Sequence, residues 1–135
     1  MVIEMRYASA LGLALLAAGA SSAFGQPKDL AAQRYPDVVA VQVHARGLEM
    51  FDFDVTVSSP YDTPQRYADA FRAVGENGQV YGERRLFHDH AGEQPFTRDL
   101  HGVKIPPGVR TVVIQARDLK YGYGGKTMAA ALPGR

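Results

Sequence analysis

Two histidines separated by a single residue are the part of this sequence that most plainly suggests chemistry. They lie in the segment His88-Asp89-His90-Ala91-Gly92-Glu93. Alternate residues of a strand point to the same side with Cα atoms about 7 Å apart, so the imidazoles of His88 and His90 can reach one ion. A turn at Gly92 would place Glu93 beside them. Imidazole and carboxylate ligands suit copper or zinc, and the segment therefore predicts a metal site of His88, His90 and Glu93.

The same two histidines also have a simpler interpretation. His88 and His90 can end a strand and form ordinary hydrogen bonds at the surface, because an H-x-H pair alone is a weak signal for a metal. A third nitrogen from His44 or His101 would strengthen the metal interpretation. Both interpretations stay open at the level of the sequence.

A glycine-rich connection near the C-terminus carries two tyrosines, Tyr121 and Tyr123, in the sequence Tyr-Gly-Tyr-Gly-Gly. Exposed tyrosines provide a large contact area with a polar tip, and loops commonly carry binding residues. Tyr121 and Tyr123 are therefore candidate ligand-binding residues. In the alternative interpretation the glycines form a wide hairpin, and the two rings fold back onto the rim of the domain.

Other catalytic patterns are missing or incomplete. After residue 25 the only serines are Ser58 and Ser59, and neither lies in a GxSxG elbow. Asp52 and Asp54 share one side of a predicted strand at about 7 Å, a spacing found in glycoside hydrolases, but an exposed acidic stripe opposite the phenylalanines is the simpler explanation. We therefore predict a protein that is not an enzyme.

Composition and charge exclude several further classes. The chain has 135 residues, of which 46% are hydrophobic and 21% charged, with 15 Lys and Arg against 14 Asp and Glu and a formal net charge of +1. Because the two signs are interleaved, neither nucleic-acid binding nor a polybasic membrane patch is expected. The absence of cysteine excludes disulfides, thiolate metal sites and a cysteine nucleophile.

The first 25 residues have the pattern of a secretory signal peptide. Residues 8–20 are almost wholly apolar, follow Arg6 and precede the small residues that end at Gly25. An apolar run of this length is shorter than the roughly 20 residues that cross a bilayer. We expect cleavage near Gly25, a secreted or periplasmic location and no stable membrane insertion of the processed chain.

The processed chain alternates apolar and polar residues with a period of two. In Phe51–Val57 every second side chain is apolar, which is typical of a strand with one buried face. Asn77-Gly78 is a strong hairpin signal, because both residues tolerate positive φ. Phe71 is a candidate core aromatic. Seven strands are predicted near residues 38–45, 50–58, 67–75, 79–88, 96–103, 109–118 and 125–132.

Seven short alternating strands predict an all-β domain over residues 38–135, preceded by a leader at 26–37. An immunoglobulin-like or fibronectin-III-like sandwich is the expected architecture, with a small barrel as the competing closure. The Cys pair and Trp of antibody domains are absent, which favours the fibronectin-III-like variant.

Several segments together resemble an uncharacterised family of small secreted bacterial proteins. The resemblance covers roughly residues 50–132 and implies a compact periplasmic β domain without an assigned activity. The segments that carry it are His88-Asp89-His90, Glu93-Gln94-Pro95-Phe96-Thr97-Arg98, Gly102-Val103-Lys104-Ile105-Pro106, Ala116-Arg117-Asp118 and Tyr123-Gly124-Gly125-Lys126-Thr127.

These features together predict a secreted β-sandwich that binds a cell-envelope protein or glycan and uses no cofactor. The alternative function is a periplasmic copper- or zinc-binding protein that uses the His88-x-His90 pair.

Overall fold

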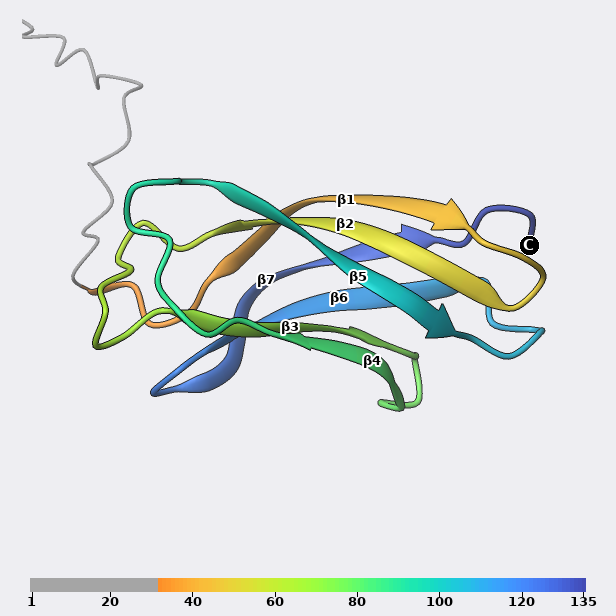
Figure 1. Cartoon of the computed structure of the whole chain (residues 1–135). Coiled ribbons are helices and arrows are strands. Elements are labelled where there is room, and N and C mark those ends of the chain that lie inside the picture. The colour runs from red at the N-terminus through yellow and green to blue at the C-terminus, as the bar shows by residue number, and fades with distance from the viewer. Residues whose placement is uncertain (1–31) are drawn as a thin grey trace, which may run out of the picture.

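The computed structural model describes residues 32–135, and the predicted signal peptide at 1–25 lies outside this range. Seven strands follow one another along the described chain (Figure 1). Their bounds are β1 Asp37–Ala45, β2 Met50–Ser58, β3 Ala68–Val74, β4 Val80–Arg85, β5 Phe96–Lys104, β6 Thr111–Asp118 and β7 Gly122–Ala131.

The strands form two sheets. One sheet has three strands in the order β1-β2-β5, the other has four in the order β4-β3-β6-β7, and all neighbouring strands are antiparallel. The prediction of an all-β fold with seven antiparallel strands is thus confirmed. Residues 32–135 contain no α-helix, and so none that could cross a membrane.

The core lies between the two sheets and consists of the apolar residues that the alternating pattern selects. Burial of each large apolar side chain contributes about 1.5–3 kcal/mol, so this layer is the main source of stability. Phe71 of β3 belongs to it, as the sequence predicted. The largest buried apolar side chains are Phe51, Phe53, Phe71, Phe96, Ile105 and Ile114.

Two strand boundaries differ by three residues from the sequence-based prediction, and the others by two or fewer. β4 ends at Arg85 instead of residue 88, and β7 begins at Gly122 instead of residue 125. At the predicted Asn77-Gly78 hairpin the chain does turn, with Gly75 N–H donating to the Gln79 carbonyl at 2.8 Å. Only Gly78 has positive φ there, at 83°. The connection is therefore longer than a two-residue turn.

The connections gather at two opposite ends of the sandwich (Figure 1). At one end, which we call the loop end, the chain enters β1, and residues 59–67, 86–95 and 119–121 join strands. At the other, the hairpin end, residues 46–49, 75–79 and 105–110 join strands and the chain reaches its C-terminus.

Arg135 connects two loops of the hairpin end through hydrogen bonds to their carbonyl groups. Its Nη1 donates to the carbonyls of Pro106 at 2.5 Å and Val109 at 3.0 Å. Its Nη2 donates to the carbonyls of Leu48 at 3.0 Å and Ile105 at 2.7 Å. One side chain thus joins the β1–β2 and β5–β6 connections.

Candidate binding site at the loop end

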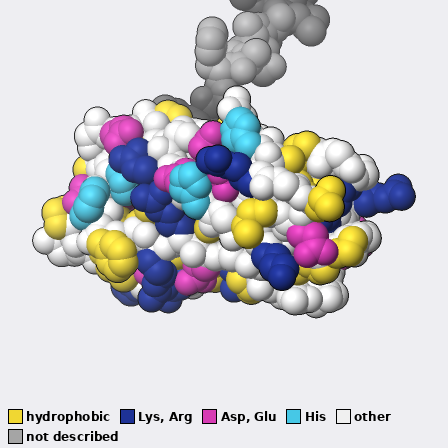
Figure 2. Space-filling model, turned by 45° about the vertical axis from the view of Figure 1, so that its right-hand side comes forward, with side chains coloured by type: hydrophobic (Ala, Val, Ile, Leu, Met, Phe, Trp, Pro, Cys, Tyr) yellow, Lys and Arg dark blue, Asp and Glu magenta, His cyan; other side chains and the backbone are white. Residues whose placement is uncertain are grey.

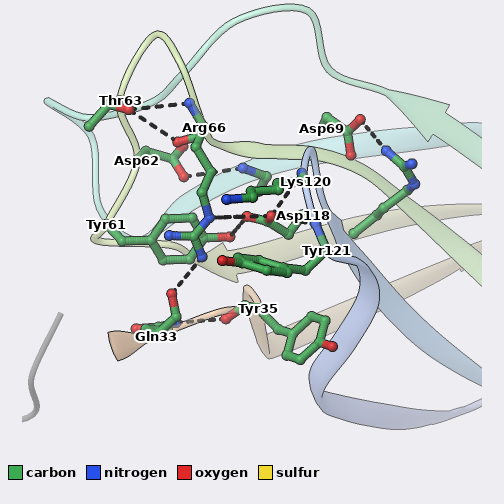
Figure 3. Close-up of polar contacts among 12 residues, drawn as sticks. Gln33, Tyr35, Tyr61, Asp62, Thr63, Arg66, Asp69, Asp118, Lys120 and Tyr121 are labelled. Carbon is green, nitrogen blue, oxygen red and sulfur yellow. Dashed lines mark hydrogen bonds and ion pairs between the residues drawn. The ribbon is translucent and has the colours of Figure 1, made fainter. Parts of the chain in front are cut away.

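A fully buried carboxylate, Asp118 at the end of β6, organises one side of the loop end (Figure 3). It accepts the Tyr61 hydroxyl at 2.6 Å, Arg66 Nε at 3.3 Å and the backbone N–H groups of Lys120 and Tyr121 at 2.9 Å each. Burial, together with the negative charge and hydrogen bond of Asp118, raises the pKa of Tyr61. The phenol therefore stays protonated and donates.

Arg66 extends this network to the segment that precedes β1. Its Nη2 donates to the Gln33 carbonyl at 2.6 Å, and its guanidinium lies 4.1 Å from the centre of the Tyr61 ring (Figure 3). Residues 33–36 of the predicted leader are therefore held against the domain; residues 26–31 lie outside the described part of the chain.

A second buried carboxylate, Asp62, fixes the β4–β5 connection. Its Oδ1 accepts the backbone N–H of Ala68 and its Oδ2 that of His90, each at 3.1 Å. Gln94 makes a second link between the two connections. Its Nε2 donates to Ser59 Oγ at 3.2 Å and to the His90 carbonyl at 3.1 Å. The segment that carries His88 and His90 is therefore bonded to the β2–β3 connection.

The two histidines lie close together, but in different surroundings. Since β4 ends at Arg85, both lie in the β4–β5 connection and not at a strand end. His90 is only 6% exposed and stacks on Phe96 with ring centres 4.0 Å apart. His88 is exposed, and its Nδ1 lies 2.9 Å from the Asp89 carbonyl. The two imidazole centres are 5.0 Å apart.

Glu93, the third predicted ligand, has a different partner. Its carboxylate accepts two hydrogen bonds from Arg98, at 3.2 and 2.9 Å, and these bonds lower the pKa of Glu93. In residues 32–135 no group of three or more His, Asp or Glu side chains is arranged to hold a metal ion. Metal binding therefore stays a prediction that rests on the histidine pair.

The surroundings of the histidine pair are cationic. A hollow of about 100 Å³ beside them is lined by Arg84, Arg85 and Arg98 together with Leu86, Phe87, His88 and His90. Like charges repel strongly at short range. Arg84 and Arg98 are paired with Asp99 and Glu93, so Arg85 is the arginine of this hollow that is most available to repel a metal cation or to bind an anionic group.

The two other histidines belong to a network on the outer face of the β1-β2-β5 sheet. His44 Nε2 lies 3.1 Å from Asp54, and His101 lies 3.3 Å from Asp52 and 2.6 Å from Asp99. These residues line a separate hollow of about 370 Å³, so they supply no third nitrogen for His88 and His90.

Asp52 in this network is held in its ionised form. The N–H of Gly102 donates to it at 2.8 Å and Arg46 pairs with it, and these contacts lower the pKa of Asp52. An ionised carboxylate cannot donate a proton near neutral pH. Asp52 is therefore not suited to be the proton donor of a glycoside hydrolase.

The two predicted binding tyrosines both make internal contacts. The ring of Tyr121 packs edge-on against Tyr35 at 6.3 Å and leaves 40% of the residue exposed. Tyr123 lies within β7, donates its hydroxyl to Glu83 at 2.5 Å and stacks under Arg72 at 3.6 Å. Tyr123 thus lies on a strand and not in a loop, and these contacts favour a structural role for both rings.

Phe87, in the β4–β5 connection, is the residue that the sequence analysis missed. It is 85% exposed and borders two hollows, the cationic one and a second of about 440 Å³ that also includes Glu83, Asp99 and His101. Figure 2 shows histidine, arginine and acidic side chains gathered near exposed apolar ones on one face. The sequence could have indicated this exposed ring, because Leu86 and Phe87 are adjacent apolar residues and two neighbours in an extended chain cannot both face the core.

Comparison with known proteins gives one informative relative. The chain is 34% identical over 95 residues to a protein of Halomicrobium mukohataei described as "Putative lipoprotein". The match covers 70% of this chain and 46% of the relative, so the aligned part spans about half of that protein. No known family profile matches the chain, and no solved structure matches it.

The buried imidazole of His90 predicts a pH dependence of stability. Burial, followed by the positive charges of Arg98 and His88, lowers the pKa of His90 below its ordinary 6.5. Below about pH 6.5 the unfolded chain therefore binds more protons than the folded chain. The stability that the neutral, buried His90 contributes is full above that pH and is lost as the pH falls.

The wild type should therefore have a lower free energy of unfolding at pH 5.5 than at pH 7.5. Urea unfolding at these two pH values should show a smaller difference in unfolding free energy for His90→Gln than for the wild type. His44→Gln, at an exposed histidine, is the control, and an unchanged pH dependence in His90→Gln would contradict the assignment.

Proposed function

We propose that this protein is a non-enzymatic binding domain of the cell envelope whose contact surface is centred on Phe87. The surface, called the Phe87 surface below, consists of Arg84, Arg85, Phe87, His88 and Arg98. The observation that carries the proposal is the 85% exposure of Phe87 on a connection that is hydrogen-bonded to its neighbours. Burial of such a ring by a partner would contribute about 1.5–3 kcal/mol.

The charges around Phe87 indicate the chemistry of the partner. Arg84 and Arg98 are paired with Asp99 and Glu93, whereas Arg85 has only a 3.8 Å contact with Glu83 and is half exposed. An aromatic anchor beside arginine is a common composition for the centre of an interface. We infer an envelope protein or glycan that presents an apolar group next to an acidic one.

Fold and location fit this role. The order β1-β2-β5 and β4-β3-β6-β7 supports a fibronectin-III-like sandwich, in which β4 joins the sheet of β3. The apolar segment at residues 8–20 and the similarity to a protein described as a lipoprotein support export to the envelope. Rigid sandwiches commonly carry their binding residues on connecting loops.

Metal binding by His88 and His90 is the second candidate function. The 5.0 Å separation of the imidazole centres favours it, and the buried Nδ1 of His90 has no hydrogen-bond partner. The neighbouring arginines disfavour it, as described above. Either Cu(II) or Zn(II) suits two imidazoles.

The Phe87 surface predicts that Phe87→Ser weakens capture of the envelope partner by the immobilised protein. Loss of the buried ring should weaken binding by about tenfold or more, because each 1.4 kcal/mol is a factor of ten. Arg85→Glu should also weaken capture, and added salt should weaken it in the wild type. The measurement is affinity capture from an envelope extract followed by titration of the captured component.

Leu48→Ser is the matched control for this experiment. Leu48 is 93% exposed but lies at the hairpin end, and only its backbone carbonyl has a structural contact. We expect Leu48→Ser to capture the partner like the wild type. Equal capture by Phe87→Ser and wild type would refute the Phe87 surface.

The second candidate function predicts saturable heat when the protein is titrated with Cu(II) or Zn(II) near pH 7. His88→Ala combined with His90→Ala should abolish that heat, because both imidazole ligands are removed. The double change His44→Ala and His101→Ala removes the same number of imidazoles elsewhere and should leave the heat unchanged. Flat titrations, or heat that survives loss of His88 and His90, would dismiss the metal function.

A further inference from the structure

A fourth hollow, of about 430 Å³, lies at the hairpin end and shares no residue with the Phe87 surface. It opens between the β3–β4 turn and the β5–β6 connection. Its size lies in the range of about 300–1,000 Å³ that is usual for small-molecule sites. The residues that line it are Glu76, Asn77, Tyr81, Gly108, Val109, Arg110 and Thr111.

One aromatic ring, that of Tyr81, lies at the side of this hollow. Tyr81 is partly buried and packs against the core. Gly75 makes room for it, because a Cβ at that position would lie 2.8 Å from the Tyr81 hydroxyl and 2.9 Å from the ring. The ring is therefore fixed between the turn and the core, and it offers the hollow an ordered apolar surface.

The polar groups around the ring have no partner of their own. Within residues 32–135 the Glu76 carboxylate, the Arg110 guanidinium and the Tyr81 hydroxyl make no hydrogen bond or ion pair. This contrasts with Arg84, Arg98 and Arg117, each of which is paired with a carboxylate. Glu76 and Arg110 line the same hollow without pairing with each other, so donors and acceptors are available to a third group between them.

The chemistry of this lining indicates a neutral ligand with many hydroxyls. One carboxylate and one guanidinium cancel in charge, so neither an anion nor a cation is preferred. A carboxylate and an arginine fork can bind adjacent hydroxyls as acceptor and donor, and an aromatic ring packs on the apolar C–H face of a sugar. We propose that the hollow binds one neutral sugar unit of a carbohydrate, stacked on Tyr81 and hydrogen-bonded by Glu76 and Arg110.

This site goes beyond the Phe87 surface and stands independently of it. The two lie at opposite ends of the sandwich, so a carbohydrate and the envelope partner can be bound together. Loss of one site is expected to leave the other unchanged, which makes the two proposals separately testable.

The test is an NMR titration of the purified protein with a panel of methyl glycosides of glucose, galactose, mannose and N-acetylglucosamine. At least one glycoside should shift the amides of residues 75–81 and 108–111 in a saturable way. Tyr81→Ala should weaken that binding about tenfold, and Tyr81→Phe, which keeps the ring, should retain most of it. Glu76→Gln and Arg110→Gln should weaken it without affecting the fold, because both side chains are exposed and unpaired.

Lys104→Gln is the matched control, because Lys104 is an exposed cation that lies outside the hollow. It should bind the glycoside like the wild type. Absence of saturable shifts with all four glycosides would overturn the proposal. Binding that Glu76→Gln and Arg110→Gln leave intact would also overturn it, as would shifts at these amides produced by the zwitterion glycylglycine but by no glycoside.

Discussion

Two buried carboxylates, Asp62 and Asp118, hold the loop end of the sandwich in one arrangement. Asp62, in the β2–β3 connection, accepts the backbone N–H of His90 in the β4–β5 connection. Asp118 accepts two backbone N–H groups of the β6–β7 connection and the side-chain donors of Tyr61 and Arg66 from the β2–β3 connection, so that the three connections form a single hydrogen-bonded unit. A buried carboxylate is costly unless it is fully bonded, and removal of one partner from a buried ion pair costs about 3–5 kcal/mol. The geometry of the loop end therefore depends on these two groups more than on the sequence of the loops themselves.

The Phe87 surface is a consequence of this constraint. Phe87 lies three residues before His90, whose backbone N–H is bonded to Asp62. The contact between His90 and Phe96 fixes the same segment from the side of β5. A large apolar ring is thus presented to solvent on a connection with several internal hydrogen bonds, which reduces the conformational entropy that this connection loses when a partner binds.

Charge pairing separates the hollow at the hairpin end from the remaining surface. On the outer face of the β1-β2-β5 sheet, Asp52, Asp54 and Asp99 all have cationic or histidine partners. At the hairpin end, Glu76 and Arg110 have none within the described chain. The paired groups stabilise the surface of the sheet, and the unpaired groups remain available to a ligand.

Much of the fold could be predicted from the sequence, because a half-buried strand imposes a period of two. The pattern of Phe51–Val57 gave β2 with its buried face, and Asn77-Gly78 gave the position of the β3–β4 turn. The start of β7 was placed three residues late, because glycines that pair as strand residues have the same composition as a loop. No local pattern distinguishes Gly124, which pairs with Ala116, from a turn glycine.

The candidate sites were harder to predict, because they depend on contacts between distant segments. The two histidines of the H-x-H pair do lie close together, with ring centres 5.0 Å apart, but their spacing does not show that Glu93 pairs with Arg98 or that three arginines line the neighbouring hollow. The sequence also did not indicate that the Asp62 carboxylate accepts a hydrogen bond from the backbone N–H of His90, 28 positions away. Such contacts follow from the packing of the two sheets and not from spacing along the chain.

Hydrogen–deuterium exchange at the His90 amide tests the central claim most directly. Asp62→Ala removes the acceptor of this N–H and should accelerate its exchange by about ten- to a hundredfold, while the amide of Ile114 in β6 stays protected. Asp54→Ala, which removes an exposed carboxylate, should leave both amides unchanged. An equally slow His90 amide in Asp62→Ala and in the wild type would contradict the account.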